Sequence, residues 1–554
     1  ALLAAGAAHA AGEEPAASQP HGHAHGGAAA DAARPRTPPP LFDGLGRYQR
    51  KIATGSEQAQ RYFDQGLNLY YGFNLEEATR AFQEAARLDP DAIMAWWGIA
   101  LAAGPNYNSP IDEARNARAI EATQTALVLA PKASQLERDY VEALATRYSS
   151  DPNRDRAGLD RAFADAMKKL AAKYPDDLDA QTLYAESLMN LRPWDLWTFD
   201  GKPQPGTLEI VATLEGVLKK APDHPGANHL YVHAVEASAE PGRGLAAADR
   251  LTALVPAAGH LVHMPAHIYM RTGRYAQAAE ANVKAIAADR AYFELSDPSF
   301  EYRAMYYPHN IDFLWSAASM EGRSQESLRA ARELAASTPP DMIRQMVDME
   351  PAAVAPLFVL ARFGRWDDVL AEPAPPSDLP FATGSWHFVR GLAFTRKGEL
   401  EQADAELAAL GKTMDATPPE RSVQIVNKAK DILAVESEVL AGEIAATRGR
   451  YDEAIARLEK AVAMQDRLRY MEPPPFYYPV RQSLGAVLLA AGKPAQAEAV
   501  YRCDLELNPA NGWSLYGLAQ SLRAQDRMDE ADEVQKQLVA AWKRADVQLA
   551  SSRF

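Results

Sequence analysis

One spacing of small and aromatic residues recurs at both ends of this 554-residue chain. A glycine is followed after 12 residues by an alanine, after 4 more by an aromatic residue and after 8 more by a proline. The two sets are Gly66, Ala78, Phe82 and Pro90, and Gly485, Ala497, Tyr501 and Pro509. Small residues at these intervals let two antiparallel helices approach closely, the aromatic ring fills the space between them, and proline ends the second helix. The spacing therefore predicts repeated helix pairs.

Amphipathic helical patterns separated by short turns rich in glycine, aspartate and proline continue from residue 55 almost to the end of the chain. Together with the glycine–alanine–aromatic–proline spacing, this pattern resembles the tetratricopeptide repeat (TPR) family. The resemblance implies an all-α fold, a right-handed α-solenoid of roughly ten TPR-like helix pairs. It implies little about function, because most members of the family bind other proteins.

Changes in composition divide the chain into five segments. Residues 1–10 are small and apolar and end in Ala8-His9-Ala10, which is typical of the end of a signal peptide and its cleavage site. Residues 11–54 are rich in His, Pro and Ala and predict a flexible leader. We expect an N-terminal TPR array over 55–338, a degenerate repeat with a proline-rich loop over 339–380, and a C-terminal TPR array over 381–554.

Charge and composition narrow the classes of partner. A net charge of −15 makes nucleic acid an unfavourable partner, because the phosphates would be repelled over most of the surface. No stretch approaches the ~20 apolar residues of a membrane span. The one cysteine, Cys503, excludes an internal disulfide framework and any metal site with several thiolates. With the signal-peptide pattern, these features predict a periplasmic or secreted protein.

Two histidine pairs are the most specific chemical feature of the sequence. His229 and His233 are four residues apart, as are His263 and His267, so each pair leaves one face of its helix. The two pairs are offset by 34 residues, which is one repeat length. His260 lies on the same predicted helix as the second pair. We therefore expect both pairs side by side on neighbouring repeats.

The repeat register predicts which face these histidines occupy. In the TPR family the first helix of each pair lines the concave groove. Val232 lies 24 residues before Pro256, the same distance as from the packing glycine of the first repeat to its proline. Ala266 lies 12 residues before Ala278, which repeats the glycine-to-alanine spacing. This register turns all five histidines, and Glu236 with them, toward the groove.

Neighbouring repeats contribute further polar and aromatic candidates to the same groove. Glu186 occupies a groove-facing position in the preceding repeat, and His309 opens the first helix of the following one. Two possible alignments of this following repeat give His309 repeat positions that differ by one residue. The candidate substrate-binding residues are Asn106, Asn108, Asn190, Trp194 and Tyr307. The loops that carry these residues can also simply cap long helices, and the sequence leaves both substrate binding and helix capping open.

Clustered imidazoles and carboxylates predict a transition-metal site, with copper favoured and iron or zinc as alternatives. The predicted ligands are His229, His233, His260, His263, His267 and His309. Glu236 and Glu186 are the candidate catalytic residues, because a carboxylate there can act as a general base on metal-bound water. His224, in a Pro-Asp-His-Pro turn, is expected to be exposed, and His387 is expected to be structural.

Two functions remain open from the sequence. In the first, the chain is a metalloprotein, and an open coordination position supports oxidation or hydrolysis of a peptide or small molecule in the groove. In the second, the chain is a TPR scaffold that binds a partner's peptide without metal, with the histidines as polar contacts. The sequence does not identify a substrate or an oligomeric state.

Overall fold

The computed structural model describes residues 38–553, and nearly all the regular structure in this range is helical. A short hairpin, β1 (Ser422–Val423) and β2 (Asn427–Lys428), is antiparallel and pairs Ser422 with Lys428. The predicted all-α class is confirmed. Among the described residues, no helix is both long enough and apolar enough to cross a membrane. The predicted signal-peptide remnant lies outside the described residues.

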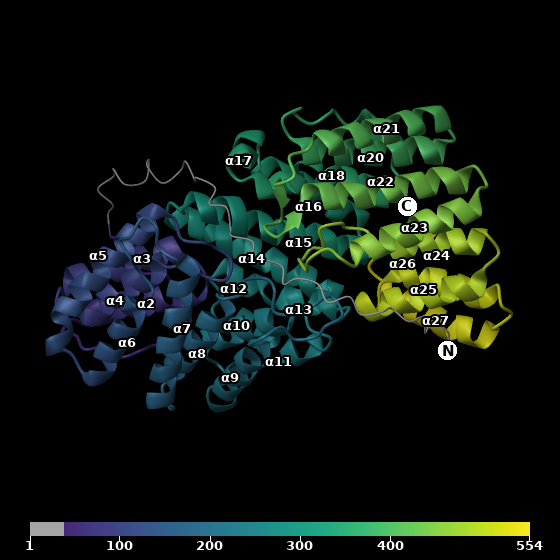
Figure 1. Ribbon diagram of the computed structural model, residues 1–554. Coiled ribbons are helices and arrows are strands. Elements are labelled where there is room, and N and C mark those ends of the chain that lie inside the picture. Colours follow the sequence, from purple (N-terminus) through teal and green to yellow (C-terminus); the bar gives the residue numbers. More distant parts are fainter. Residues whose placement is uncertain (1–37, 554) are drawn as a thin grey trace, which may run out of the picture.

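Consecutive helices of the N-terminal half pack against each other in pairs (Figure 1). The pairs are α2 (Glu57–Tyr71) with α3 (Leu75–Leu88), α4 (Ile93–Ala103) with α5 (Glu113–Leu129), α6 (Gln135–Ala145) with α7 (Arg156–Lys173), α8 (Leu178–Met189) with α9 (Thr207–Lys220), and α10 (Pro225–Val235) with α11 (Leu245–Leu254). Short 3-10 helices at Ala130–Lys132 and Pro241–Gly244 lie between elements of this series.

The middle of the chain keeps the pairing but contains two irregularities. Its elements are α12 (Gly259–His263) and α13 (Pro265–Arg271) with α14 (Tyr275–Leu295), a π-helix (Tyr302–Tyr306), α15 (Tyr307–Met320) with α16 (Ser324–Ser337), α17 (Pro340–Gln345), a 3-10 helix (Val347–Val354), α18 (Ala355–Arg362) and α19 (Trp366–Ala371). One irregularity is the interruption at Pro265, where proline offers no N–H to continue the helix. The other is the π-helix, which inserts an extra residue just before α15.

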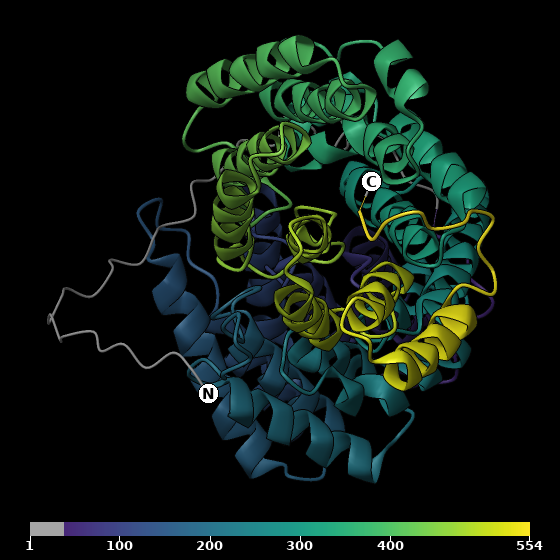
Figure 2. The same ribbon diagram turned by 90° about the vertical axis from the view of Figure 1, so that its right-hand side faces the viewer.

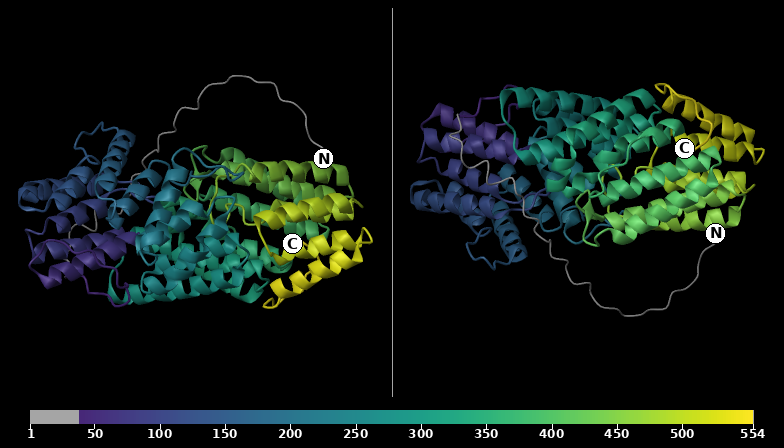
Figure 3. Two further views of the ribbon diagram at one scale, coloured as in Figure 1. Left: turned by 90° about the horizontal axis from the view of Figure 1, so that it is seen from below. Right: turned by 90° about the horizontal axis from the view of Figure 1, so that it is seen from above.

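Regular pairs resume in the C-terminal half. They are α20 (Pro380–Lys397) with α21 (Leu400–Ala416), α22 (Ala429–Thr447) with α23 (Tyr451–Gln465), α24 (Val480–Ala490) with α25 (Pro494–Leu507), and α26 (Gly512–Arg523) with α27 (Met528–Ala541). Figure 3 shows the teal middle elements between the purple and blue N-terminal helices and the green and yellow C-terminal ones.

In the two repeats that carry the full spacing, the aromatic residue lies between two glycines. A Cβ atom on Gly66 would lie 2.6 Å from the Phe82 ring, and one on Gly98 of the next pair would lie 2.5 Å from it. Tyr501 packs in the same way against Gly485 and Gly517. The repeat spacing is thus explained by steric fit, because three successive helices meet around one ring.

This packing predicts opposite effects for one substitution at two helical glycines. Gly98→Ala is expected to lower the free energy of unfolding by about 1–3 kcal/mol, because the new methyl group overpacks the Phe82 ring. Gly216 lies within α9 and has no neighbour within 4 Å of an added Cβ. Gly216→Ala should therefore raise stability by up to about 1 kcal/mol through helix propensity. Chemical denaturation of both variants tests this, and equal effects would contradict the packing argument.

The C-terminal pairs curl back onto the middle of the chain, as the end-on view in Figure 2 shows. Trp513 of α26 donates its indole N–H to the Ser319 carbonyl of α15 at 3.3 Å. Asp546 accepts a hydrogen bond from the backbone N–H of Ser324 at the start of α16, at 2.7 Å. These contacts join segments about 200 residues apart in the chain.

The described part of the predicted flexible leader, residues 38–54, is packed against the repeats. Arg50 forms ion pairs with Asp177 at 2.9 Å and with Asp179 at 2.7 Å, and Tyr48 donates its hydroxyl to Asp179 at 2.7 Å. Ile52 is buried. The expectation of flexibility is therefore wrong for these residues, because Arg50 and Tyr48 are held by partners more than a hundred residues away in the chain.

Candidate metal centre

Four helices bring the six predicted histidine ligands together. His229 and His233 extend from α10, while α12 and α13 carry the other pair and His260. His309 comes from the first turn of α15. Five of the six rings are at most 2 % exposed, and His309 is part-buried. The six histidines therefore lie together in the protein interior, whereas the repeat register predicted an open groove.

The histidine nitrogens form two groups of three. In the first group, which contains His233, the Nε2 atoms of His229 and His260 are 3.1 Å apart. In the second group, which contains His309, the Nε2 atoms of His263 and His267 are 3.0 Å apart. Within each group one ligand atom from every residue lies within 4.8 Å of the others. Each group can thus surround a single metal ion.

The opposite ring nitrogen of several histidines is held by a hydrogen-bond acceptor. Nδ1 of His229 lies 2.6 Å from the Tyr71 carbonyl oxygen, and Nδ1 of His263 lies 2.7 Å from the Asn282 side-chain oxygen. Because these oxygens only accept, each Nδ1 must carry the proton, which leaves a lone pair on Nε2. This is the arrangement that orients histidine ligands in metal sites.

Two carboxylates lie beside the Nδ1 atoms of His233 and His267. Glu236 lies 3.0 Å from Nδ1 of His233 and 2.7 Å from Nδ1 of His267. Glu472 lies 3.1 Å from the same Nδ1 of His267. Glu236, predicted as a catalytic residue, is thus placed beside the Nδ1 atoms of one histidine from each group. Glu236, His267 and Glu472 also form a third set of close ligand atoms.

Burial and mutual proximity control the protonation of the cluster. Burial, together with neighbouring histidines, holds the pKa of His229, His260 and His263 well below its usual range. Burial lowers the pKa of His309 to about 3. His267 differs: burial opposes its charge, but Glu236 and Glu472 outweigh burial and raise its pKa to about 10. Four imidazoles are therefore neutral near pH 7, which is the form that binds metals.

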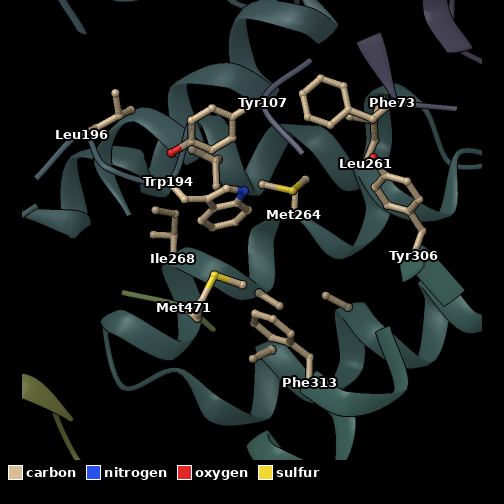
Figure 4. Close-up of a cluster of buried hydrophobic side chains, with 14 of the residues drawn as sticks. Phe73, Tyr107, Trp194, Leu196, Leu261, Met264, Ile268, Tyr306, Phe313 and Met471 are labelled. Carbon is tan, nitrogen blue, oxygen red and sulfur yellow. The ribbon is translucent and has the colours of Figure 1, made fainter. Parts of the chain in front are cut away.

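Aromatic rings contact the histidines, and they belong to a cluster of buried hydrophobic side chains that Figure 4 shows without the histidines. Phe73 and Phe313 lie on opposite sides of this hydrophobic cluster in the view, and Tyr107 and Trp194 lie together on a third side. The Trp194 ring lies 5.5 Å from the His233 ring in an edge-on arrangement. A shell of such side chains excludes water and lowers the local dielectric constant, which strengthens electrostatic interactions inside it.

A small cavity lies beside the first histidine group. It is lined by His233, Glu236, Tyr470 and a set of apolar and aromatic neighbours that includes Trp194. The Trp194 Nε1 and His233 Nε2 atoms are buried without a hydrogen-bond partner among the described residues. Trp194, predicted as a substrate-binding residue, is therefore placed next to the histidines.

The predicted asparagines occupy different places. Asn106 is buried, and its side-chain oxygen accepts hydrogen bonds from the backbone N–H groups of Asn108 and Ser109 at 2.9 and 2.8 Å. Both asparagines neighbour the hydroxyl of Tyr306, whose ring lies 4.8 Å from that of His260. Tyr306 therefore connects both asparagines with the histidine cluster. Asn190 caps the end of α8, and no contact joins it to the histidines within the described range.

Tyr307 is not brought to the cluster. Its hydroxyl donates to Glu333 at 3.1 Å and accepts from Arg290 at 3.2 Å, which places it on the outer side of the helix. Tyr306 takes the inner position instead. A π-helix directly before α15 carries Tyr306, and the substrate-binding role of Tyr307 stays a prediction.

Glu186, the second candidate catalytic residue, lies in an adjacent buried layer. It accepts the Tyr70 hydroxyl at 2.8 Å, and burial raises its pKa to about 7. No hydrogen bond or ion pair among the described residues links Glu186 to a histidine. Its connection to the centre is indirect, since Tyr70 precedes the residue whose carbonyl holds His229.

The two histidines set apart by the sequence both have structural partners. His387 lies 2.6 Å from Glu406, on a helix far from the cluster. His224 is only 1 % exposed, so the expectation that it is exposed was wrong. It caps α10 by accepting the Ala227 N–H at 3.2 Å, and its other nitrogen lies 3.1 Å from the Tyr48 hydroxyl. Tyr48, in residues 38–54, contacts the turn that contains His224, and the sequence spacing does not predict this contact.

Sequence reasoning missed Glu472 and the two phenylalanines. Glu472 belongs to an aromatic and proline-rich loop, and nothing in its local sequence connects it with a histidine 205 residues away. Phe73 follows α2 and Phe313 lies in α15, where each reads as an ordinary core residue. The only available signal was the unusual Tyr-Met-Glu-Pro-Pro-Pro segment around Glu472.

No protein-family model and no curated protein matches this sequence. Similar solved structures include a human IFIT1 dimer with m7Gppp-AAAA, which is 14 % identical, with 88 % of this chain and 91 % of that chain covered and a TM-score of 0.33. Yeast Tom70 is 12 % identical, with 86 % and 96 % covered and a TM-score of 0.34. Likenesses at this level carry no argument about function. The tetratricopeptide-like helical fold stands on the chain's own helix pairs.

Proposed function

We propose that this chain is an exported metalloprotein that binds a transition metal through the buried histidines of its middle repeats, with copper favoured. The export part of the proposal rests on the pattern of residues 1–10 alone. The metal part rests on one structural observation: the Nε2 atoms converge in pairs 3.0 and 3.1 Å apart, while acceptors hold Nδ1 of the same or neighbouring rings.

Convergence of this kind places either a shared proton or a metal ion between the two rings of each pair. Two imidazole lone pairs repel each other at 3 Å unless a proton or a metal ion lies between them. Burying six imidazoles also removes their hydration, which costs free energy unless each nitrogen finds a partner. A metal ion supplies partners for several nitrogens at once. The Nε2 atom of His233, in the first group, has no hydrogen-bond partner among the described residues.

The donor set favours copper. All six candidate ligands are imidazoles, and the carboxylates lie on the Nδ1 side of the rings. Imidazole suits copper, zinc, iron and nickel, and copper binds nitrogen donors most tightly among the divalent ions of the first row. An ion held by three imidazoles keeps an open coordination position, which metal-dependent oxidation or hydrolysis requires. Zinc and iron are the alternatives for the metal assay.

Burial also weighs against the alternative function, a peptide-binding scaffold without metal. A peptide contacts side chains on an accessible groove, whereas five of these six rings are at most 2 % exposed. The cavity beside His233 is small and lined by aromatic rings, so it suits a small molecule and not a peptide.

Elemental analysis tests the proposal. The purified full chain, loaded with Cu(II) and then dialysed, is expected to retain metal in stoichiometric amount. The double variant His229→Ala/His263→Ala removes one Nε2 from each converging pair and should retain none. His387→Ala is the matched control and should behave as wild type, because its partner is Glu406.

Circular dichroism confirms that each protein is folded before the metal is counted. A wild-type protein that retains no copper, zinc or iron after loading would overturn the metal proposal and favour the scaffold. Unchanged metal content in the folded double variant would show that the ligands lie elsewhere.

A further inference from the structure

The six histidines are arranged as two layers, each with its own aromatic cap. Phe73 contacts every ring of the first group, with centroid distances of 4.4 Å to His229, 6.1 Å to His233 and 5.6 Å to His260. No ring contact joins Phe73 to the second group in the described part of the chain. This cap therefore belongs to one histidine layer.

Phe313 plays the same part for the second group. Its ring lies 4.6 Å from His263, 4.6 Å from His267 and 4.9 Å from His309. The cluster is thus ordered as a phenylalanine, three histidines, three histidines and a phenylalanine. A single central site would leave no reason for two separate caps.

The layers face each other directly. The rings of His233 and His267 are 5.6 Å apart, and those of His260 and His263 are 5.8 Å apart. Ring spacing within a layer is similar, at 4.8 to 6.2 Å, so the layers are distinguished by their nitrogens: each contains its own Nε2 pair, 3.1 Å apart in the first and 3.0 Å apart in the second. The nitrogens therefore converge on two centres, one in each layer. No convergent nitrogen pair joins one layer to the other within the described residues.

The acceptors that lie beside the Nδ1 atoms are also divided between the two layers. The first layer has the Tyr71 carbonyl on His229, and the second has the Asn282 side chain on His263. Glu236 is shared, because its two oxygens reach His233 in one layer and His267 in the other. Such a carboxylate fixes the orientation of the layers relative to each other while leaving Nε2 of each ring toward its own group.

The geometry points to a centre for two metal ions, with three imidazoles on each. This inference rests on the proposed function and specifies its stoichiometry. Three protein ligands leave each ion an open position, and sharing one small ligand between the facing layers would require the ions to be about 3.5–4 Å apart, as in other two-metal sites. The shared ligand belongs to the class of one- or two-atom oxygen donors, such as hydroxide or dioxygen, because the shell leaves no room for a larger group.

A rival arrangement uses the set of Glu236, His267 and Glu472 as a metal site. His267 would then bind through Nδ1, the nitrogen that faces both carboxylates. In the two-layer arrangement His267 binds through Nε2 and its Nδ1 proton is shared with the carboxylates. Glu472→Gln distinguishes these arrangements, since it keeps an acceptor for Nδ1–H but removes the anionic ligand.

Metal counting on single variants tests the inference. The wild-type full chain, saturated with Cu(II) and dialysed, is expected to retain two ions per chain. His229→Ala and His263→Ala should each retain one, since each disables one layer. Glu472→Gln and the control His387→Ala should retain two. Electron paramagnetic resonance gives an independent readout: two Cu(II) ions that share a ligand couple magnetically and lose signal, whereas each single variant should show the full signal of one isolated Cu(II).

The outcomes separate the two proposals. No retained metal in the wild type would overturn the proposed function itself. One ion per chain, with an uncoupled signal, would leave the proposed function standing and overturn the two-ion inference. A folded single variant that loses both ions, or keeps both, would also overturn the assignment of one ion to each layer. Loss of one ion in Glu472→Gln would favour the rival carboxylate site.

Discussion

Glu236→Ala is expected to lower the affinity for metal by about 10- to 100-fold, which is the effect of removing an acceptor that orients a histidine ligand. The effect should extend to both histidine groups, because the two oxygens of Glu236 lie beside Nδ1 of His233 and Nδ1 of His267. Without this carboxylate Nδ1 of His233 loses its acceptor, and Nδ1 of His267 keeps only Glu472. Competition with a chelator of known affinity measures the change.

Glu186→Ala is the matched control for this prediction. Glu186 is also a fully buried glutamate of the middle repeats, but its hydrogen-bond partner is Tyr70 and not a histidine. Its removal should leave metal affinity unchanged. Glu236→Gln should fall between wild type and alanine, because the amide oxygen can still accept one Nδ1–H. Equal losses in the Glu186 and Glu236 variants would show that the effect is general destabilisation.

Metal loading is expected to stabilise the fold by about 4 kcal/mol at a thousand-fold excess of free metal over Kd. The ion binds the folded chain because only folding assembles ligands from α10, α12, α13 and α15. Loading also supplies partners for buried nitrogens that have none among the described residues, such as His233 Nε2. Differential scanning calorimetry of the metal-loaded and chelator-treated protein should show a clear rise in Tm.

The double variant His229→Ala/His263→Ala should lose this metal-dependent rise while keeping a cooperative transition. Magnesium serves as the control ion, since it prefers oxygen ligands and should not shift Tm in either protein. A wild-type Tm that is insensitive to copper, zinc and iron would contradict the prediction. An equal shift in the double variant would show that the metal binds elsewhere.

The repeat spacing predicted both the helix pairs and the histidine face, because each depends on contacts within one or two repeats. Gly66 and Gly98 meet the Phe82 ring through neighbouring helices, so their spacing in the chain follows from helix geometry. The 34-residue offset of the histidine pairs depends on the same local geometry. Local periodicity is the strongest signal that a single sequence contains.

Predictions failed where the structure departs from that periodicity. Tyr306, at the end of the π-helix before α15, lies beside His260, whereas the hydroxyl of Tyr307 contacts Glu333 and Arg290. Residues 38–54 have no apolar periodicity, yet Arg50 is fixed by Asp177 and Asp179. Neither the π-helix nor the long-range ion pairs of Arg50 can be predicted from the repeat spacing.

By itself, then, the sequence determined the helix pairs, the shared face of His229, His233, His263 and His267, and the nitrogen-rich character of the site. Only the tertiary structure decided that this face is sealed, that the histidines separate into two layers, and that Glu472 reaches His267. The reason is closure of the solenoid: the C-terminal repeats fold back on the middle ones through contacts such as Trp513 with Ser319. The free energy of such contacts depends on groups about 200 residues apart, and no local spacing encodes it.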